Sequence, residues 1–296
     1  MQPSENITLP SIREAREAFR DALLPVYEIG EANQLTRIIF EDAFKLFDAQ
    51  SSEPFVFGQY TDEFLTKLLA HVPVQYLMGK ADFYGRKFIV DYRVLIPRQE
   101  TEELVFEILQ RVKSGQISPN ARGLEIGTGS GCIASTLQLE SPTLDIWACD
   151  ISREALDVAE YSAAKLNAQV HFLQMDALDS NAWNPLPQFD FIVSNPPYIP
   201  YDERAQMDPG VIQNEPALAL FVADDDPFIF YKTILDQGRK HLLAGGFIFF
   251  EINALRRQQM TLMMADFDDY EYEFKKDING MDRMLICTRR KRAQMI

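Results

Sequence analysis

Hydrophobic residues in the first quarter of the chain recur every three or four positions, which is the spacing of one face of a helix. One such stripe runs through 12–23, where Ser11 and Glu14 have the spacing of a capping box. A second stripe runs through 31–47, and Thr61 is placed to cap a third helix. The pattern therefore predicts a small helical bundle whose charged outer faces are solvated.

The pattern changes after Asp82. The stretch Phe83–Val90 predicts two short strands around a turn at Gly85, a hairpin placed to join two domains. From Gly123 onward, short apolar runs alternate with helical stretches, which indicates a βαβ sheet and hence the α/β class. The last two strands are placed to pair as an antiparallel edge. The predicted strands are 123–126, 144–149, 170–173, 189–194, 246–252 and 283–288, and the predicted helices are 100–112, 133–139, 152–166, 228–243 and 260–265.

The charge balance narrows the range of partners. The 296 residues include 29 Lys and Arg against 44 Asp and Glu, a formal net charge of −15. Broad binding to a phosphate backbone needs Lys and Arg that displace counterions, so nucleic acid is disfavoured and a small ligand or a basic protein is favoured. The three cysteines and three histidines form no metal-binding motif, and no apolar run is long enough to span a membrane. We expect a soluble, reduced, cytoplasmic protein without a metal.

A glycine-rich loop follows the first predicted strand of the sheet. Its spacing after Glu125 is GxGxG, rather than the GxGxxG of dinucleotide binders. Glycine lets the backbone approach a ligand, and Asp150 at the end of the next strand is placed to accept hydrogen bonds from ribose hydroxyls. Glu125 repels a pyrophosphate but tolerates an ammonium group, so S-adenosylmethionine fits these residues better than NAD does. The alternative for the loop and Asp150 is an ordinary glycine turn with an ordinary aspartate at a strand end. Asp176, after the third strand, is either an adenine contact or a turn residue.

The tetrapeptide Asn195-Pro196-Pro197-Tyr198 follows the strand 189–194 and is the most specific signal in the chain. Proline fixes its own φ and restricts the residue before it, so Asn195 is expected to be extended. Because proline lacks an N–H, the carbonyl of Pro196 and the side-chain oxygen of Asn195 form two rigid acceptors for the hydrogens of a planar –NH₂ group. Tyr198 offers a face for stacking. The alternative is a proline-rich turn that only closes a strand.

Two acceptors on one nitrogen favour methyl transfer to an amide or an exocyclic amine. Holding both N–H groups aims the nitrogen lone pair at an electrophilic methyl carbon, and the acceptors stabilise the positive charge that develops during in-line attack on a sulfonium methyl. The methylated nitrogen becomes strongly acidic. Its proton can therefore leave to water or a backbone carbonyl without a strong base.

With these motifs the chain resembles the protein-(glutamine-N5) methyltransferases, the PrmC/HemK group that modifies peptide chain release factors. The order and spacing of the whole series is more specific than Asn195–Tyr198 alone, which adenine-amine DNA methyltransferases share. The markers are Pro73–Leu77, Gly79, Phe83–Gly85, Arg93–Arg98, Glu100–Glu102, Gly127–Gly131, Asn195–Tyr198, Glu215–Leu220, Asp277, Gly280, Asp282 and Arg283.

The resemblance implies a Rossmann-like class I methyltransferase domain at 99–296, joined by a β-hairpin linker at 79–98 to a helical substrate-recognition domain at 1–78. It implies S-adenosylmethionine as methyl donor, S-adenosylhomocysteine as product, and the glutamine of a Gly-Gly-Gln loop in a class I release factor as acceptor. It also places Arg98–Glu102 over the cofactor cleft, where a capped helix start is the alternative. The implied cofactor residues are Gly127, Thr128, Gly129, Ser130, Gly131, Asp150, Asp176, Ala177 and Asn195, and the implied substrate residues are Asn195, Pro196, Pro197 and Tyr198, of which Asn195, Pro196 and Tyr198 are catalytic.

Three departures from the family pattern concern loop geometry. Ala177 stands where many members have an aromatic residue, so a ring that covers the adenine is either lost or supplied elsewhere. Val222–Asp226 replaces a glycine-rich turn, and Asn253 replaces the glycine of Glu-Ile-Gly. None of these departures changes the expected reaction.

Three other functions stay open on the sequence. A glutamine methyltransferase of a ribosomal protein has the same chemistry, although Arg98–Glu102 favours the release-factor branch. An adenine-amine methyltransferase of nucleic acid predicts a basic face and an apparatus for base flipping, against the net charge of −15. A cofactor-binding module without catalysis has no need of the rigid turn at Asn195–Tyr198.

Overall fold

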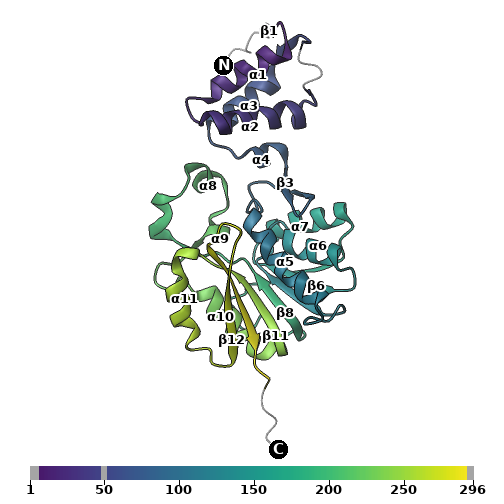
Figure 1. The fold of residues 1–296 in the computed structure, drawn as a ribbon, viewed down its shortest axis with the longest axis vertical. Coiled ribbons are helices and arrows are strands. Elements are labelled where there is room, and N and C mark those ends of the chain that lie inside the picture. The colour runs from purple at the N-terminus through teal and green to yellow at the C-terminus, as the bar shows by residue number, and fades with distance from the viewer. Residues whose placement is uncertain (1–6, 48–51, 292–296) are drawn as a thin grey trace, which may run out of the picture. The chain divides into compact units, whose positions relative to one another are not determined.

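The computed structural model describes residues 7–47 and 52–291, and the chain forms two compact units (Figure 1). The first unit combines 1–79 with 208–214, and the second combines 80–207 with 215–296. The first unit therefore takes a short segment from the middle of the second. Within the described ranges, no helix has the length and apolarity needed to cross a membrane.

The first unit is built from helices around a core that includes Phe19 and Phe40. Ser11 caps the first helix as predicted, since its Oγ accepts a hydrogen bond from the Glu14 N–H at 3.2 Å. Helix α8 comes much later in the sequence but belongs to this unit. Nδ2 of its Asn214 donates a hydrogen bond to the carbonyl of His71 at 3.0 Å. The elements are β1 (Ile7–Leu9), α1 (Ile12–Leu23), α2 (Ile29–Arg37), η1 (Ile38–Ala43), β2 (Phe55–Phe57), α3 (Gln59–Leu69), α4 (Val74–Met78) and α8 (Pro209–Asn214).

Two predictions in this unit are wrong. Thr61 does not cap a helix, because α3 already begins after Gly58 and Thr61 is buried inside it. The stripe over 31–47 is not one α-helix, because α2 passes into the π-helix η1. The wider π turn allows Ile39 and Phe40, which are neighbours in sequence, to be buried together in the core.

The second unit is built on a seven-stranded sheet. Its order is β12 (Tyr270–Lys276), β13 (Asp282–Arg289), β11 (Leu242–Glu251), β8 (Phe189–Ser194), β5 (Arg122–Ile126), β6 (Asp145–Asp150) and β7 (Val170–Gln174). The predicted antiparallel pairing of the last two strands is confirmed, since Phe247 of β11 lies opposite Thr288 of β13. Strand β12 was not predicted, and it pairs with the other side of β13. The four strands β8, β5, β6 and β7, together with β11, are parallel.

Helices cover both faces of this sheet (Figure 1). Phe191 and Val193 of β8 are buried with α5 and α6, whereas Ile192 between them is buried with α10 and α11. The strand order reverses between β5 and β8, and in such sheets ligands bind outside the carboxyl ends of the strands at the reversal. The helices are α5 (Gln99–Lys113), α6 (Cys132–Glu140), α7 (Arg153–Leu166), α10 (Ile229–His241) and α11 (Arg257–Met264).

The predicted hairpin is present as β3 (Lys80–Phe83) and β4 (Arg86–Ile89). Phe83 and Phe88 are fully buried in the core of the second unit, so the hairpin packs as part of that unit. The division of the chain into 1–78, 79–98 and 99–296 stays a prediction about how its parts work. The remaining short elements of the second unit are β9 (Ile199–Pro200), η3 (Tyr201–Gln206), α9 (Ala217–Leu220), β10 (Phe221–Val222) and η4 (Ala254–Arg256).

Candidate active site

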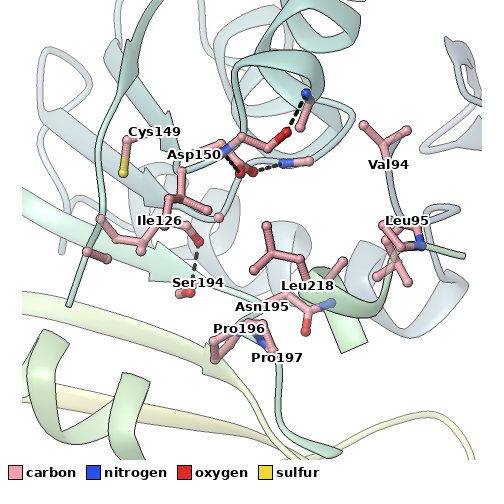
Figure 2. Close-up of a pocket in the computed structure, with 18 of the residues that line it drawn as sticks. Val94, Leu95, Ile126, Cys149, Asp150, Ser194, Asn195, Pro196, Pro197 and Leu218 are labelled. Carbon is pink, nitrogen blue, oxygen red and sulfur yellow. Dashed lines mark hydrogen bonds between the residues drawn. The ribbon is translucent and has the colours of Figure 1, made fainter. Parts of the chain in front are cut away.

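A pocket of about 430 Å³ lies at the carboxyl ends of β5, β6 and β8. Figure 2 shows Ile126 and Asp150 on one side of it, Val94 and Leu95 on the other, and Asn195 between them. Small-molecule sites in proteins have volumes of roughly 300–1,000 Å³. The pocket therefore joins the glycine loop, the strand-end aspartate and the proline turn in one site of ligand size.

The glycine loop makes a sharp turn between β5 and α6. Gly127, Gly129 and Gly131 have φ values of 73°, 52° and 77°, in the left-handed region that other residues disfavour. Gly127 and Gly129 line the pocket, whereas Gly131 is the N-cap of α6 and lies outside the lining. Thr128 and Ser130 are buried and also lie outside the lining. Only two of the five predicted loop residues thus form the wall, and the others support it.

Backbone and side-chain hydrogen bonds hold the loop from behind. The N–H groups of Gly127 and Thr128 donate to the carbonyl of Cys149 at 2.9 and 3.0 Å, which ties the loop to β6. Oε2 of Glu125 accepts hydrogen bonds from the Thr128 hydroxyl at 2.6 Å and from the Ala134 N–H at 2.9 Å. Burial raises the pKa of Glu125 to about 8, although these two hydrogen bonds oppose the rise. The expectation that Glu125 acts on the ligand is corrected, because it is buried outside the lining and fastens the loop to α6.

Asp150 ends β6 and lines the pocket. Its Oδ2 accepts a hydrogen bond from the Gly129 N–H at 2.9 Å, and its Oδ1 accepts one from the Ser152 N–H at 3.0 Å (Figure 2). Burial raises the pKa of Asp150, and the same two N–H groups oppose the rise. Each carboxylate oxygen has a further lone pair, so the fixed side chain can still accept hydrogen bonds from two adjacent hydroxyls.

Asp176 and Ala177 both line the pocket where the chain leaves β7. Oδ1 of Asp176 accepts a hydrogen bond from the Leu178 N–H at 2.9 Å, so this residue is a turn residue and a wall residue at once. The carbonyl of Ala177 accepts a hydrogen bond from the indole N–H of the buried Trp183 at 2.9 Å. No aromatic residue follows Asp176 on this side of the pocket, because the small Ala177 stands there and its backbone is held by Trp183.

The proline turn follows β8 directly. Ser194 donates a hydrogen bond from Oγ to the carbonyl of Ile126 at 2.9 Å, which fixes the start of the turn to β5. Asn195, Pro196 and Pro197 then line the pocket. Tyr198 lies outside the lining and packs against the core beneath the sheet. In the described part of the chain, no protein group donates a hydrogen bond to the Asn195 side-chain oxygen or to the Pro196 carbonyl.

Some of the residues that line the pocket were not predicted as site residues. Two of the motifs that resemble the family, 93–98 and 215–220, supply some of them, so for these residues a signal was present in the sequence. The two motifs are joined by an ion pair, since Arg98 donates from Nη2 to Oε1 of the buried Glu215 at 2.7 Å. The unpredicted lining residues include Tyr92, Val94, Leu95, Leu218 and Phe230.

Comparison with known proteins places the chain in a family. Residues 103–214 match the model of the Methyltransferase small domain. A Bacteroides thetaiotaomicron protein named "Release factor glutamine methyltransferase" is 42% identical over 229 residues, which are 77% of this chain and 80% of that protein. The chain belongs to the release factor glutamine methyltransferases. A Bacillus subtilis protein of the same name is 41% identical over 220 residues, 72% of this chain and 74% of that protein.

This membership confirms the family that the motifs indicated. The crystal structure of a methyltransferase from Pyrococcus furiosus gives a TM-score of 0.51 at 14% identity and covers 78% of this chain and 100% of that chain. At such identity the likeness shows the fold alone. The predicted class I methyltransferase fold is confirmed.

S-adenosylmethionine is the methyl donor of release factor glutamine methyltransferases, and the charges of the pocket fit it. The carboxylates of Asp150, Glu154 and Asp176 belong to the lining. The lining also contains Arg93, but its guanidinium is paired with Asp91 at 2.6 Å. A ligand with a sulfonium and an ammonium group suits such a lining, whereas a pyrophosphate does not. The described residues contain no cluster of His, Cys, Asp and Glu that could hold a metal ion.

Proposed function

We propose that this chain methylates the side-chain amide nitrogen, N5, of the glutamine in the Gly-Gly-Gln loop of a class I peptide chain release factor. Relatives at 41–42% identity carry the corresponding name. The observation that carries the proposal is the shared pocket, which is lined by Asp150 on one side and by Asn195–Pro197 on another. A site for a methyl donor and a site for a planar amide therefore meet in one cavity.

Asn195 and Pro196 bind the substrate amide in this proposal. The Asn195 side-chain oxygen and the Pro196 carbonyl each accept a hydrogen bond from one N–H of the glutamine, and Pro197 shapes the space beside it. Tyr198, which was expected to stack on the amide, lies outside the lining and supports the turn from the core. An amide nitrogen is a weak nucleophile because its lone pair is delocalised. Two fixed acceptors orient that lone pair and stabilise the positive charge that develops on nitrogen, without reorganisation during the reaction.

The glycine loop and the strand ends bind the donor in this proposal. S-adenosylmethionine supplies an electrophilic methyl group on a positively charged sulfur. Gly127 and Gly129 leave space for a close approach of the backbone, Asp150 holds hydroxyl groups, and Asp176 and Ala177 lie beside the base. Asn195 borders both ligands, since it lines the pocket between the two sides.

The remaining parts of the chain receive roles that follow from the same proposal. The helical segment 1–78 recognises the release factor and the hairpin segment 79–98 links it to the catalytic segment 99–296. Release factors act during translation, so the proposed place of action is the cytoplasm. The proposed partner is the release factor itself, with no direct role for nucleic acid, in keeping with the net charge of −15.

A labelling experiment tests the proposed function. The purified chain receives S-adenosylmethionine labelled in its methyl group, together with one of four acceptors. These are a class I release factor, its variant with alanine in place of the loop glutamine, a ribosomal protein that carries a methylated glutamine in cells, and duplex DNA. We expect label on the intact release factor alone, with peptide mass spectrometry locating it on the loop glutamine.

Each other result selects a different function. Label on the ribosomal protein assigns the chain to the sister branch with the same chemistry. Label on DNA assigns an adenine-amine methyltransferase. Binding of the donor in calorimetry with no label on any acceptor assigns a module without catalysis.

A further inference from the structure

The orientation of the Asn195 side chain decides whether the amide grip works. An asparagine amide carries an oxygen that accepts and an –NH₂ group that donates, and a rotation of 180° exchanges them. Only the oxygen can accept a hydrogen bond from a substrate –NH₂ group. The Nδ2 atom of Asn195 lies 3.3 Å from Oγ1 of Thr101, which belongs to the first turn of α5. This contact gives the –NH₂ group of Asn195 a partner inside the protein.

The direction of the hydrogen bond between Asn195 and Thr101 is set by the next residue in the chain of contacts, Glu251. The Thr101 hydroxyl lies 2.6 Å from Oε2 of Glu251, the last residue of β11, and both residues are buried. The Thr101 hydroxyl is the donor in this contact, so its single proton is directed at Glu251. The lone pairs of Thr101 then accept from Asn195 and exclude its oxygen. The chain Asn195–Thr101–Glu251 therefore has one consistent direction, which leaves Oδ1 of Asn195 as the free acceptor.

The same carboxylate contacts the other end of the proline turn. Oε1 of Glu251 lies 3.5 Å from the Tyr198 hydroxyl. Burial raises the pKa of Glu251, while its hydrogen bond from Thr101 and the charge of Arg283 oppose that rise. Arg283 is held in turn by Asp277, whose Oδ2 accepts from its Nε at 3.2 Å. One buried carboxyl group thus reaches the first residue of the turn through Thr101 and contacts the last residue directly.

We infer that Thr101 and Glu251 are positioning residues that fix the amide of Asn195 with its oxygen directed to the substrate nitrogen. The inference rests on the proposed function, because it names how the grip on the glutamine amide is kept in one orientation. Thr101 itself lies outside the lining of the pocket. It acts on the reaction through Asn195 and not through contact with either ligand.

Removal of the Thr101 hydroxyl tests the inference. Thr101→Val keeps the shape of the side chain, and Thr101→Ala removes the same hydroxyl without any risk of a clash. Both are expected to lower kcat for the release factor about 10²-fold, the scale of a small misplacement at a reacting centre. The affinity for S-adenosylmethionine in calorimetry is expected to stay unchanged. Thr101→Ser restores the hydroxyl and is expected to restore kcat.

Two further measurements separate positioning from general damage. Thr136→Val is the matched control, because Thr136 is a fully buried threonine on α6 whose hydroxyl has no partner in the described part of the chain. This control is expected to turn over as wild type does. Combined with Asn195→Ala, Thr101→Val is expected to cause no additional loss, because a residue that acts through Asn195 has no effect once Asn195 is gone.

The outcomes distinguish this inference from the proposed function. If wild type does not methylate the release factor, the proposed function fails first. If wild type is active and Thr101→Val and Thr101→Ala keep its kcat, the positioning role is wrong. A double variant whose loss is the product of the two single losses overturns it as well, because Thr101 then acts independently of Asn195.

Discussion

The two sides of the pocket are held in place by different kinds of contact. The donor side, 127–131 with Asp150, is held mainly by hydrogen bonds from backbone N–H groups, between residues that are nearer in sequence, as in the contact of Asp150 with Gly129, 21 residues away. The acceptor side is held by side chains that are far apart. Asn195 contacts Thr101 across 94 residues, and Thr101 contacts Glu251 across 150. A local motif thus specifies one side of the site, while the folded domain specifies the other.

Substitutions on the two sides of the pocket are expected to have different effects. On the donor side, the residues touch the ligand or the loop that carries it, so changes there are expected to alter affinity. On the acceptor side, the contacts fix the direction of one amide, so changes there are expected to alter turnover at unchanged affinity for the donor. Single-residue variants on each side can therefore test whether affinity and turnover separate in this way.

The largest effect is expected at Asn195. Asn195→Ala removes one of the two acceptors, and we expect kcat to fall by about 10²–10³, by analogy with the loss of one hydrogen bond to a developing charge. The affinity for S-adenosylmethionine is expected to change far less. Steady-state kinetics with release factor and calorimetry with the donor measure the two quantities. The control is Asn184→Ala at an exposed position outside the pocket lining, and near-normal turnover of Asn195→Ala would falsify the amide grip.

The same contrast explains how much could be predicted from the sequence. The glycine loop, Asp150 and the proline turn were found because each is a short motif at the end of an apolar strand. The strands β5, β6, β7 and β8 lie within one or two residues of their predicted ranges, since each contains a short apolar run that is bounded by polar or turn residues. The motif residues and the strands that carry them are thus local properties of the chain.

What was missed depends on contacts between distant segments. The sequence gives no role to the buried Glu251, because nothing near it in sequence shows that Thr101 donates to it. Glu125 was expected to act on the ligand, but its partners Thr128 and Ala134 are visible only in the folded loop. Strand β12 was missed because it is an edge strand rich in charged residues, which resembles a solvated segment.

The second prediction concerns the donor side. Asp150→Ala removes a carboxylate that accepts two backbone N–H bonds and lines the pocket, so we expect the affinity for S-adenosylmethionine to fall roughly 10- to 100-fold, the value of one or two hydrogen bonds to a charged group. Calorimetry measures it directly. Asp268→Ala, at an exposed position on the segment before β12, is the control. Unchanged donor affinity in Asp150→Ala would show that this carboxylate only braces the loop.

The third prediction concerns the stability of the loop. The pKa of Glu125 is raised to about 8 in the folded chain, so the native state binds a proton that the unfolded chain releases near its ordinary value of 4.5. The contribution of Glu125 to stability is therefore fully present below that ordinary value and is lost as the pH rises toward 8. Glu125→Gln keeps an acceptor for Thr128 and Ala134 but removes the titration.

Urea unfolding at pH 5 and pH 8 measures this effect. Between these two pH values, the free energy of unfolding of wild type is expected to fall relative to Glu125→Gln by on the order of 3 kcal/mol, since most of the shift from 4.5 to about 8 lies inside this window. Glu271→Gln, on an exposed position of β12, is the control and should follow wild type. A parallel pH dependence in wild type and Glu125→Gln would mean that Glu125 stays charged and solvated in the folded loop.

The smallest effect is expected from salt, and it acts on the encounter with the release factor. A release factor works against ribosomal RNA, so its surface is expected to be basic, and a chain with a net charge of −15 attracts it over distance. We expect kcat/KM for the release factor to fall about 3- to 10-fold between low and high salt, because screening slows the encounter. A short uncharged peptide with the Gly-Gly-Gln sequence is the matched control and should show no such fall. The peptide binds at the same turn, Asn195–Tyr198. A salt effect of equal size on both acceptors would therefore place the attraction in the pocket. If salt has no effect on the release factor, charge does not contribute to docking.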